Sequence, residues 1–430
     1  MNMLRILICT VLPFVAGMTA QAAPWTLRRC IDYARTHNIQ VQSAEVSNSS
    51  AGVNLLQAKA RQTPTLSFAT GQGVSHANEE GTSYSGSYSL NAGLTIYQGG
   101  QLANTVKKQE IQTRSTLLNV DVARNDIEIS VTEAYLAILY ANENLKTMRQ
   151  TVEASAAQLE RTEALLEAGS VSVSDYAQIE TQYSSDVYDR TVAENTLAQA
   201  KLKLKQLLEL ELEDDFEVAF PVVDDAEVMA AVPELAEVYA SATQVMPQVE
   251  SSRLEVEAAQ VNEKIAKGQK MPTVSLSAAV GTGNFSNGGY SFFNQLSNKL
   301  NESATVNVSV PIFNNRSARS AIDLARLDTR SSELSYAQTM KDLLSDVESL
   351  WEDAVSAQSR FEAATGKLKS AELSYRLVQE QFDSGMKNAV DLLTEKNNYL
   401  SAQQEQIQAK YQSVLSLQLL EFYRGGVIEL

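Results

Sequence analysis

The residues that most often carry enzyme chemistry are few in this sequence and stand far apart. There are two histidines, His37 and His76, and two cysteines, Cys9 and Cys30. Protein metal sites need several such side chains at close and regular spacing, which this sequence does not offer. A serine in a Gly-x-Ser-x-Gly elbow is also missing. We therefore expect a protein that is not an enzyme and holds neither a metal nor a cofactor.

Two short segments superficially match phosphate-binding loops. They are Gly71-Gln72-Gly73 and Gly281-Thr282-Gly283. A phosphate loop opens a helix, so that backbone N–H groups cradle the anion, whereas both segments lie within strand-like sequence. The formal net charge of −17 also argues against nucleic acid as a partner, because its phosphates would be repelled. The carboxylates are scattered over helical sequence, where we expect them to be solvated.

Four segments alternate between apolar and small polar residues with a period of two, which is typical of strands with one apolar face. The clearest is 84–97, where Ser, Asn, Gly and Thr separate the apolar positions. Similar alternation occurs at 65–74, at 274–281 and at 305–312. The segments predict two β-hairpins, at about 64–98 and about 272–313, joined by polar loops.

Two interpretations of these hairpins are open. One is a half-buried sheet in a soluble protein. The other is part of a transmembrane barrel, which the nearly uncharged polar face and strands of ~9–11 residues favour. Four strands cannot close a barrel, and lipid does not tolerate an open sheet edge. A membrane barrel would therefore require oligomerisation: a dimer gives eight strands with a filled interior, whereas a trimer gives twelve and a lumen.

The sequence contains an internal repeat that covers nearly its whole length. Leu27–Ser67 aligns without a gap on Leu235–Ser275, and Gly169 and Asp175 later correspond to Gly385 and Asp391 at a larger offset. The extra residues of the second copy therefore lie in its hairpin. We expect a first repeat at 23–212, an acidic linker at 213–232 and a second repeat at 233–430, each with one β-hairpin.

Long helices follow each predicted hairpin. Between Gly100 and Pro221 the sequence has one glycine, Gly169, and no proline, and the corresponding part of the second repeat is similarly free of helix breakers. Apolar residues recur there every three or four positions, as in a coiled coil. The predicted long helices are at about 103–168 and 317–384, and the predicted return helices are at about 174–210 and 389–423.

Each long helix would extend roughly 100 Å at ~1.5 Å per residue. A globular core does not need helices of that length, whereas a pillar that crosses a periplasm does. The fold class expected is mainly α-helical with a membrane β-barrel. The alternative is a trimeric coiled-coil stalk of the cell envelope without a conducting pore, which accounts for the helices but not for the strands.

The N-terminal residues have the pattern of a secretory signal peptide. Arg5 precedes an apolar stretch at 6–16 that is too short for a membrane-spanning helix. Ala20-Gln21-Ala22 fits the small-x-small cleavage pattern, so we expect 1–22 to be removed, with cleavage after Ala23 as the alternative.

Removal of the signal would leave Cys30 as the single cysteine, so no disulfide could form within the chain. The remaining sequence has no apolar run of ~18 residues. If the mature chain enters a membrane, it must therefore do so as strands.

With these features at these spacings, the sequence resembles the TolC family of outer-membrane efflux channels. The resemblance covers nearly all of the mature chain. It rests on the repeat, on the strand-to-helix junctions Tyr97–Gly100 and Pro311–Arg316, and on the turns Gly169–Asp175 and Gly385–Asp391. At the junctions, the residues of interest are Gly99, Gly100, Pro311 and Asn314.

The resemblance implies a homotrimer, with a twelve-stranded barrel surrounded by outer-membrane lipid and a twelve-helix tunnel in the periplasm. It also implies a periplasmic adaptor and an inner-membrane pump at the far end of the tunnel, in contact with the turns at Gly169 and Gly385. Such a channel conducts substrates passively in efflux or type I secretion.

The resemblance further assigns an acidic constriction and a closed-state lock to the second repeat. Asp391 matches the constriction, and Thr394 stands where the family often has a second acid, so Glu395 is the candidate to share that role. Lys387 matches the basic residue of the lock, Asp175 its acidic partner, and Phe382 an aromatic residue of the same lock. The alternatives are that Asp175 caps the return helix, that Lys387 is solvated, and that Phe382 packs in the coiled-coil core.

Overall fold

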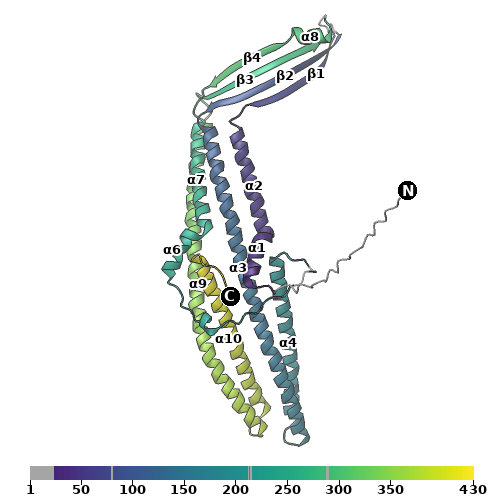
Figure 1. The fold of residues 1–430 in the computed structure, drawn as a ribbon, viewed down its shortest axis with the longest axis vertical. Coiled ribbons are helices and arrows are strands. Elements are labelled where there is room, and N and C mark those ends of the chain that lie inside the picture. The colour runs from purple at the N-terminus through teal and green to yellow at the C-terminus, as the bar shows by residue number, and fades with distance from the viewer. Residues whose placement is uncertain (1–23, 79–80, 212, 214–215, 287–289) are drawn as a thin grey trace, which may run out of the picture.

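The chain forms a small β-sheet at one end of a set of long helices, with the two helical hairpin tips at the other end (Figure 1). This computed structural model describes residues 24–78, 81–211, 213, 216–286 and 290–430. The signal peptide expected at 1–22, including Cys9, lies outside the described residues.

The two repeats contain corresponding elements in the same order, except that the second has an additional short helix between its two strands. In the first repeat these are α1 Leu27–His37, α2 Ile39–Ala60, β1 Thr65–Ala77, β2 Gly81–Gln98, α3 Gln101–Glu167 and α4 Val173–Leu207. In the second they are α6 Leu235–Val245, α7 Pro247–Gly268, β3 Thr273–Phe285, α8 Phe292–Asn298, β4 Asn301–Ser309, α9 Ser317–Asp383 and α10 Ala389–Tyr423. A short helix between them, α5 Asp225–Val228, lies in the acidic linker.

Corresponding helices of the two repeats have equal lengths. The long helices α3 and α9 have 67 residues each, and the return helices α4 and α10 have 35 each. The helices before the hairpins also match, with 11 residues in α1 and α6 and 22 in α2 and α7. The repeat found in the sequence is therefore also a repeat in three dimensions.

The strands form one antiparallel sheet in the order β1-β2-β3-β4. The central pairing of β2 with β3 joins the two repeats, with Leu90 opposite Val280. Phe68 of β1 lies opposite Leu90 as well, so the apolar positions of neighbouring strands share one face. Four antiparallel strands in a mainly helical chain confirm the predicted fold class.

The second hairpin differs from the expectation at two places. The alternation at 305–312 predicted a strand as far as Ile312, but β4 ends at Ser309. Pro311 has no N–H group to donate to a ladder, which explains the early end. The connection between β3 and β4, expected to be a polar loop, contains the helix α8.

The predicted coiled-coil seam is largely buried. Most of its residues in α3 and α9 belong to buried clusters, whereas Leu117 of α3 is 52% exposed. The largest core lies near the middle of the molecule, where the linker crosses the helices: Trp25 and Val218 form a parallel bridge, and the Tyr135 hydroxyl donates a hydrogen bond to the Ala219 carbonyl at 2.7 Å. Among the described residues, no helix is both long enough and apolar enough to cross a membrane.

Candidate functional site

The chemically reactive side chains remain dispersed in the structure. The His37 ring stacks on Tyr33 at 3.9 Å between ring centres, whereas His76 lies in the β1–β2 hairpin beside Thr82. Cys30 is buried in α1 with a free thiol, and burial raises its pKa to about 12, so the reactive thiolate is suppressed. In the described part of the chain, no three His, Cys, Asp or Glu side chains are grouped as metal ligands.

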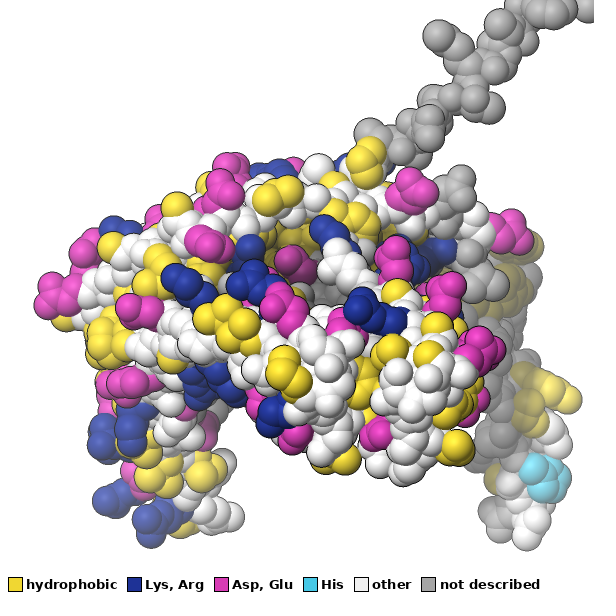
Figure 2. Space-filling view, turned by 90° about the horizontal axis from the view of Figure 1, so that it is seen from below, with side chains coloured by type: hydrophobic (Ala, Val, Ile, Leu, Met, Phe, Trp, Pro, Cys, Tyr) yellow, Lys and Arg dark blue, Asp and Glu magenta, His cyan; other side chains and the backbone are white. Residues whose placement is uncertain are grey.

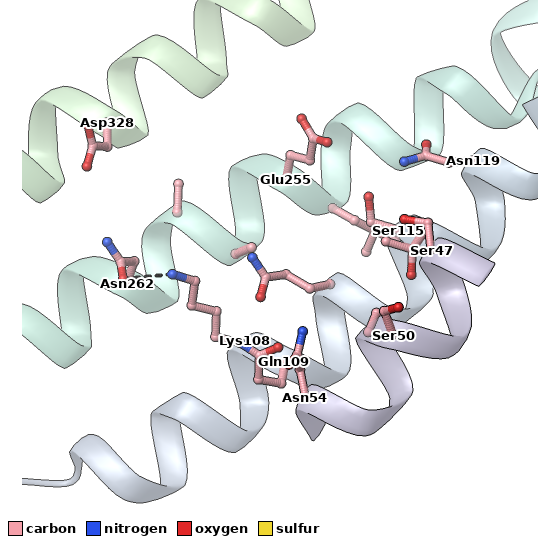
Figure 3. A pocket seen from close by; sticks show the side chains of 16 residues that line it. Ser47, Ser50, Asn54, Lys108, Gln109, Ser115, Asn119, Glu255, Asn262 and Asp328 are labelled. Atoms are coloured by element: carbon pink, nitrogen blue, oxygen red, sulfur yellow. Dashed lines mark hydrogen bonds between the residues drawn. The ribbon is translucent and has the colours of Figure 1, made fainter. Parts of the chain in front are cut away.

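The polar groove in Figure 3 shows no catalytic arrangement either. It has a volume of about 590 Å³ and lies between α2, α3 and α7 near the sheet. Its lining is dominated by Ser, Asn and Gln side chains, and Lys108 donates a hydrogen bond to Asn262 at 3.0 Å. No histidine or cysteine lines this groove.

Both hairpin tips begin with the same glycine turn. Gly169 and Gly385 have φ of 71° and 73°, a left-handed conformation that costs glycine little. Each ends its long helix in a Schellman motif: Gly169 N–H donates to Leu166 O at 2.9 Å, and Gly385 N–H donates to Phe382 O at 2.9 Å. The predicted tip glycines are therefore the residues that end α3 and α9.

In the first tip, Asp175 is part of a capping box rather than the N-cap itself. Ser172 is the N-cap of α4, and its hydroxyl accepts a hydrogen bond from Asp175 N–H at 3.1 Å. The Ser172 hydroxyl also donates to the Asp175 carboxylate at 2.6 Å, and this contact, with hydrogen bonds from Ser172 N–H and Ala389 N–H, lowers the pKa of Asp175. Asp175 thereby reaches from the first hairpin to the start of α10.

In the second tip, the N-cap is Asn388, whose side-chain oxygen accepts a hydrogen bond from Asp391 N–H at 2.9 Å. The Asp391 carboxylate lies 3.3 Å from the Lys387 ammonium, and both side chains are 42% exposed. Within one chain, Lys387 thus pairs with Asp391, while Asp175 is held by its own cap. The predicted Lys387–Asp175 lock stays a prediction for the assembled protein.

The other two constriction candidates differ in their surroundings. Thr394 is exposed, and its hydroxyl donates to Val390 O at 2.8 Å, so it is engaged with its own helix. Glu395 is half-buried and accepts a hydrogen bond from Ser374 of α9 at 2.9 Å. Glu395 therefore ties α10 to α9, whereas the Asp391 carboxylate pairs with Lys387. Their assignment to a constriction stays a prediction.

Phe382, the aromatic lock candidate, lies in a buried cluster and is 2% exposed. It packs in that cluster with Ile179 of α4 and with Ala389 and Leu392 of α10. This contact joins the first hairpin to the second. Phe382 therefore contributes to the core at the tips, as the packing alternative proposed.

A buried charged cluster above the tips was not predicted from the sequence. Lys396 of α10 forms an ion pair with Asp186 of α4, and its ammonium donates to the Ser155 hydroxyl of α3 at 2.6 Å. The expectation that helical carboxylates are solvated is wrong for Asp186, whose side chain is 3% exposed. The only sequence signal was that the two corresponding return helices carry an acid and a base. Helical periodicity relates residues within one helix, so it does not show that Asp186 and Lys396 meet.

The strand-to-helix junctions differ between the repeats. Gly99 and Gly100 both have positive φ, and a Cβ at Gly99 would overlap the Gly268 carbonyl and approach the Met271 Cβ to 2.7 Å. In the second repeat the positive φ values belong to Asn315 and Arg316, at 48° and 65°.

Pro311 and Asn314, the residues singled out in the second junction, precede this left-handed pair. Asn314 O accepts a hydrogen bond from Ser317 N–H at 2.9 Å, at the first turn of α9.

Charged side chains of both signs are mixed over the end of the molecule that carries the tips (Figure 2). The constriction candidates, the lock candidates and the buried cluster all lie toward this end, on α3, α4, α9 and α10 or, for Lys387, in the turn between α9 and α10. The arrangement holds two helical hairpins together by contacts between side chains and offers no reacting group.

The chain is similar to known proteins over nearly its whole length. The model of the outer membrane efflux protein family matches residues 30–209 and 238–426, one match in each repeat. The outer membrane protein TolC of Vibrio cholerae serotype O1 is 22% identical over 437 residues, covering 96% of this chain and 93% of that protein.

Solved structures show the same fold. A crystal structure of CusC superposes with a TM-score of 0.82 at 18% identity, covering 93% of this chain and 92% of that one. The CmeC outer membrane channel of Campylobacter jejuni gives a TM-score of 0.81 at 16% identity, covering 94% of this chain and 87% of that one. The protein is thus placed in the outer membrane with an extension into the periplasm. The chain belongs to the outer membrane efflux protein family and is a channel of tripartite efflux or export systems, not an enzyme.

Proposed function

We propose that three copies of the chain assemble into one channel. Three sheets of four strands would close a twelve-stranded barrel, and the helical hairpins of three copies would form a tunnel below it. The channel conducts passively, from a periplasmic adaptor and an inner-membrane pump to the exterior. The pump supplies the energy and selects the cargo.

The observation that carries this proposal is the sheet with two free edges. In one chain, β1 and β4 each pair on one side only. An unpaired edge in lipid leaves N–H and C=O groups without partners, each at a cost of several kcal/mol. Pairing β1 of one copy with β4 of the next satisfies both edges, and repeating the same contact three times closes a ring.

The two faces of the sheet support a membrane barrel with a polar lumen. On one face, Leu66 and Phe68 are 70% and 66% exposed in the single chain, as lipid-facing side chains would be. The other face carries small polar residues such as Ser87, Ser89 and Asn91. Closing the sheet with the polar face inward would leave a lumen without bulky or charged side chains from these positions.

At the periplasmic end, we propose that Asp391 of three copies forms an acidic constriction to which Thr394 and Glu395 contribute. Lys387, Asp175 and Phe382 would stabilise the closed tips. The exposed turns at Gly169 and Gly385 would contact the adaptor. Support comes from the positions of these residues at the helical hairpin tips, at the end of the molecule opposite to the sheet.

The oligomeric state tests this proposal directly. The protein, purified from outer membranes in detergent, should have the protein mass of three chains in analytical ultracentrifugation with detergent-mass correction. A variant with Val306→Pro in the edge strand β4 should lose the trimer, since proline removes a ladder donor. Val306 is 62% exposed, which makes loss of core packing a small contribution. A monomeric or dimeric wild type would contradict the proposal.

A further inference from the structure

The buried cluster of Ser155, Asp186 and Lys396 joins three helices from both repeats. Ser155 lies on α3 and Asp186 on α4, which form the first hairpin, whereas Lys396 lies on α10 of the second. Lys396 contacts both other residues, and Gln182 donates a hydrogen bond to the second carboxylate oxygen of Asp186 at 2.8 Å. Every charged group of the cluster therefore has a partner.

The cluster is shielded from bulk water. The side chains of Lys396 and Asp186 are 9% and 3% exposed, and the cavity beside them measures only about 20 Å³. Another ion pair between the hairpins, Arg161 with Asp383 at 3.2 Å, leaves the arginine 58% exposed. An exposed pair contributes little to stability, whereas removing one partner of a buried pair leaves an uncompensated charge.

The position of the cluster links it to the tip. Lys396 lies on the same helix as Asp391 and Glu395, about one and a half turns from Asp391. Contacts between the hairpins continue toward the tip, where Gln379 donates to Gln158 at 3.4 Å and Ala389 N–H donates to Asp175 at 3.5 Å. Holding Lys396 against the first hairpin therefore fixes where the N-terminal turns of α10 lie.

We infer that the Lys396–Asp186 pair is a clasp that keeps the second hairpin against the first, so that Lys396 acts as a positioning residue for the channel entrance. This inference rests on the proposed function for its effect on conduction, but the clasp itself is a property of one chain. If one charge is removed, the other can regain solvation when α10 moves away from α3 and α4. The separated arrangement is then favoured over the packed one.

The test is a double-mutant cycle with Lys396→Met, Asp186→Leu and the two combined, in the full-length trimer. Hydrogen–deuterium exchange of 385–400 reports whether α10 is packed, and bilayer recordings report how open the entrance is. Each single variant should exchange about tenfold faster or more, and should conduct more, than the wild type. The double variant, which buries no charge, should return most of the way to wild type.

A matched control is Lys367→Met, which removes an exposed cation that pairs with Glu405 within the second hairpin, and it should change neither readout. Asp186→Asn is the milder variant for the case in which Asp186→Leu does not assemble, because it preserves the side-chain volume. Two results would contradict the clasp. One is a double variant whose segment 385–400 exchanges as fast as in the faster single variant. The other is a Lys396→Met variant with the same exchange and conductance as Lys367→Met. If exchange is faster in the single variants and returns toward wild type in the double variant, but the protein does not conduct, the clasp is supported and the proposed channel is contradicted.

Discussion

The two repeats share one backbone plan, but they place different side chains on it. Both tips use a glycine Schellman turn followed by an N-cap, and both have an aspartate at the third helical position, Asp175 or Asp391. Asp175 is held by Ser172 and reaches the other hairpin, whereas Asp391 pairs with the exposed Lys387. At equivalent positions, the first repeat therefore has an acid that contacts the other hairpin, and the second has an acid that pairs with a lysine of its own hairpin.

The two repeats also differ at the strand-to-helix junctions below the sheet. Gly99 in the first repeat lies against the end of α7, so its place allows no side chain. Asn315 and Arg316 in the second repeat carry side chains at the same left-handed conformation. The first repeat is thus constrained where it meets the sheet, and the second has the Lys387–Asp391 pair at its tip. We therefore propose that ion selectivity depends mainly on the second repeat.

The largest effect should come from the junctions. Gly99→Ala adds a Cβ that meets backbone at Gly268 in a positive-φ conformation, and we expect a loss of about 3 kcal/mol or more. Asn315→Gly, the matched change in the second repeat, should alter stability by less than about 1 kcal/mol. The temperature of trimer dissociation in detergent measures both, and similar losses in the two variants would remove the proposed asymmetry.

The next effect concerns selectivity at the tips. Asp391→Asn should lower the cation-over-anion permeability ratio by roughly two- to fivefold, because a charge a few ångströms from an ion in water is worth up to about 1 kcal/mol. Lys387→Ala should raise the ratio, since it removes the cation beside Asp391. Lys387→Ala should also increase leakage through the closed tip if the lock exists in the trimer.

The matched control for selectivity is Asp175→Asn, which removes the corresponding carboxylate of the first repeat. Reversal potentials in a salt gradient measure all three variants. An equal change in Asp175→Asn and Asp391→Asn would show that the exposed acid of the second repeat has no special place in the conduction path.

The glycine turns should respond alike in both repeats. Gly169→Ala and Gly385→Ala each place a Cβ in open space but force alanine into a left-handed conformation, at about 1 kcal/mol. Deuterium uptake at 164–172 and at 380–388 should therefore rise by a similar factor in each variant. A much larger rise in one tip would indicate contacts there that a single chain does not contain.

The smallest effect is the pH dependence of the first tip. Hydrogen bonds, first of all from the Ser172 hydroxyl, lower the pKa of Asp175, so its stabilising effect is complete above the pKa of the unfolded chain, about 4. That effect is lost as the pH falls through the lower pKa of the folded state. Ser172→Ala should cost the cap about 1 kcal/mol and move the pH of loosening upward. Deuterium uptake at 170–180, measured at each pH for Ser172→Ala and for wild type, should begin to rise at a higher pH in the variant. The same pH profile in both proteins would contradict the assignment of Ser172 as the group that lowers the pKa of Asp175.

The periodic parts of the fold could be predicted from the sequence. The scarcity of Gly and Pro over long apolar-periodic stretches predicted the helices α3 and α9. Gly169 predicted the first tip, because glycine adopts the left-handed turn with little strain, and Gly385 predicted the second by its correspondence with Gly169, whereas Gly366 lies within α9. The capping box at Ser172-Val173-Ser174-Asp175 was also readable, since its acid follows the serine by three residues.

The contacts between the repeats could not be predicted in this way. Asp186 and Lys396 are charged residues on helices, which helical periodicity alone assigns to solvent, and nothing in the spacing shows that they meet. The end of β4 at Ser309 follows from Pro311, although the apolar–polar alternation itself continues to Ile312. Local patterns determine the elements, whereas the pairing of the hairpins depends on packing between distant segments.

The central claim is that three copies form a pore that conducts ions, and single-channel recording of the purified trimer in a planar bilayer tests it most directly. We expect discrete, stable conductance steps that favour cations and decrease in selectivity with Asp391→Asn. A protein that sediments as a trimer and inserts into the bilayer, yet leaves its conductance at the level of bare lipid, would contradict the claim and support a structural stalk.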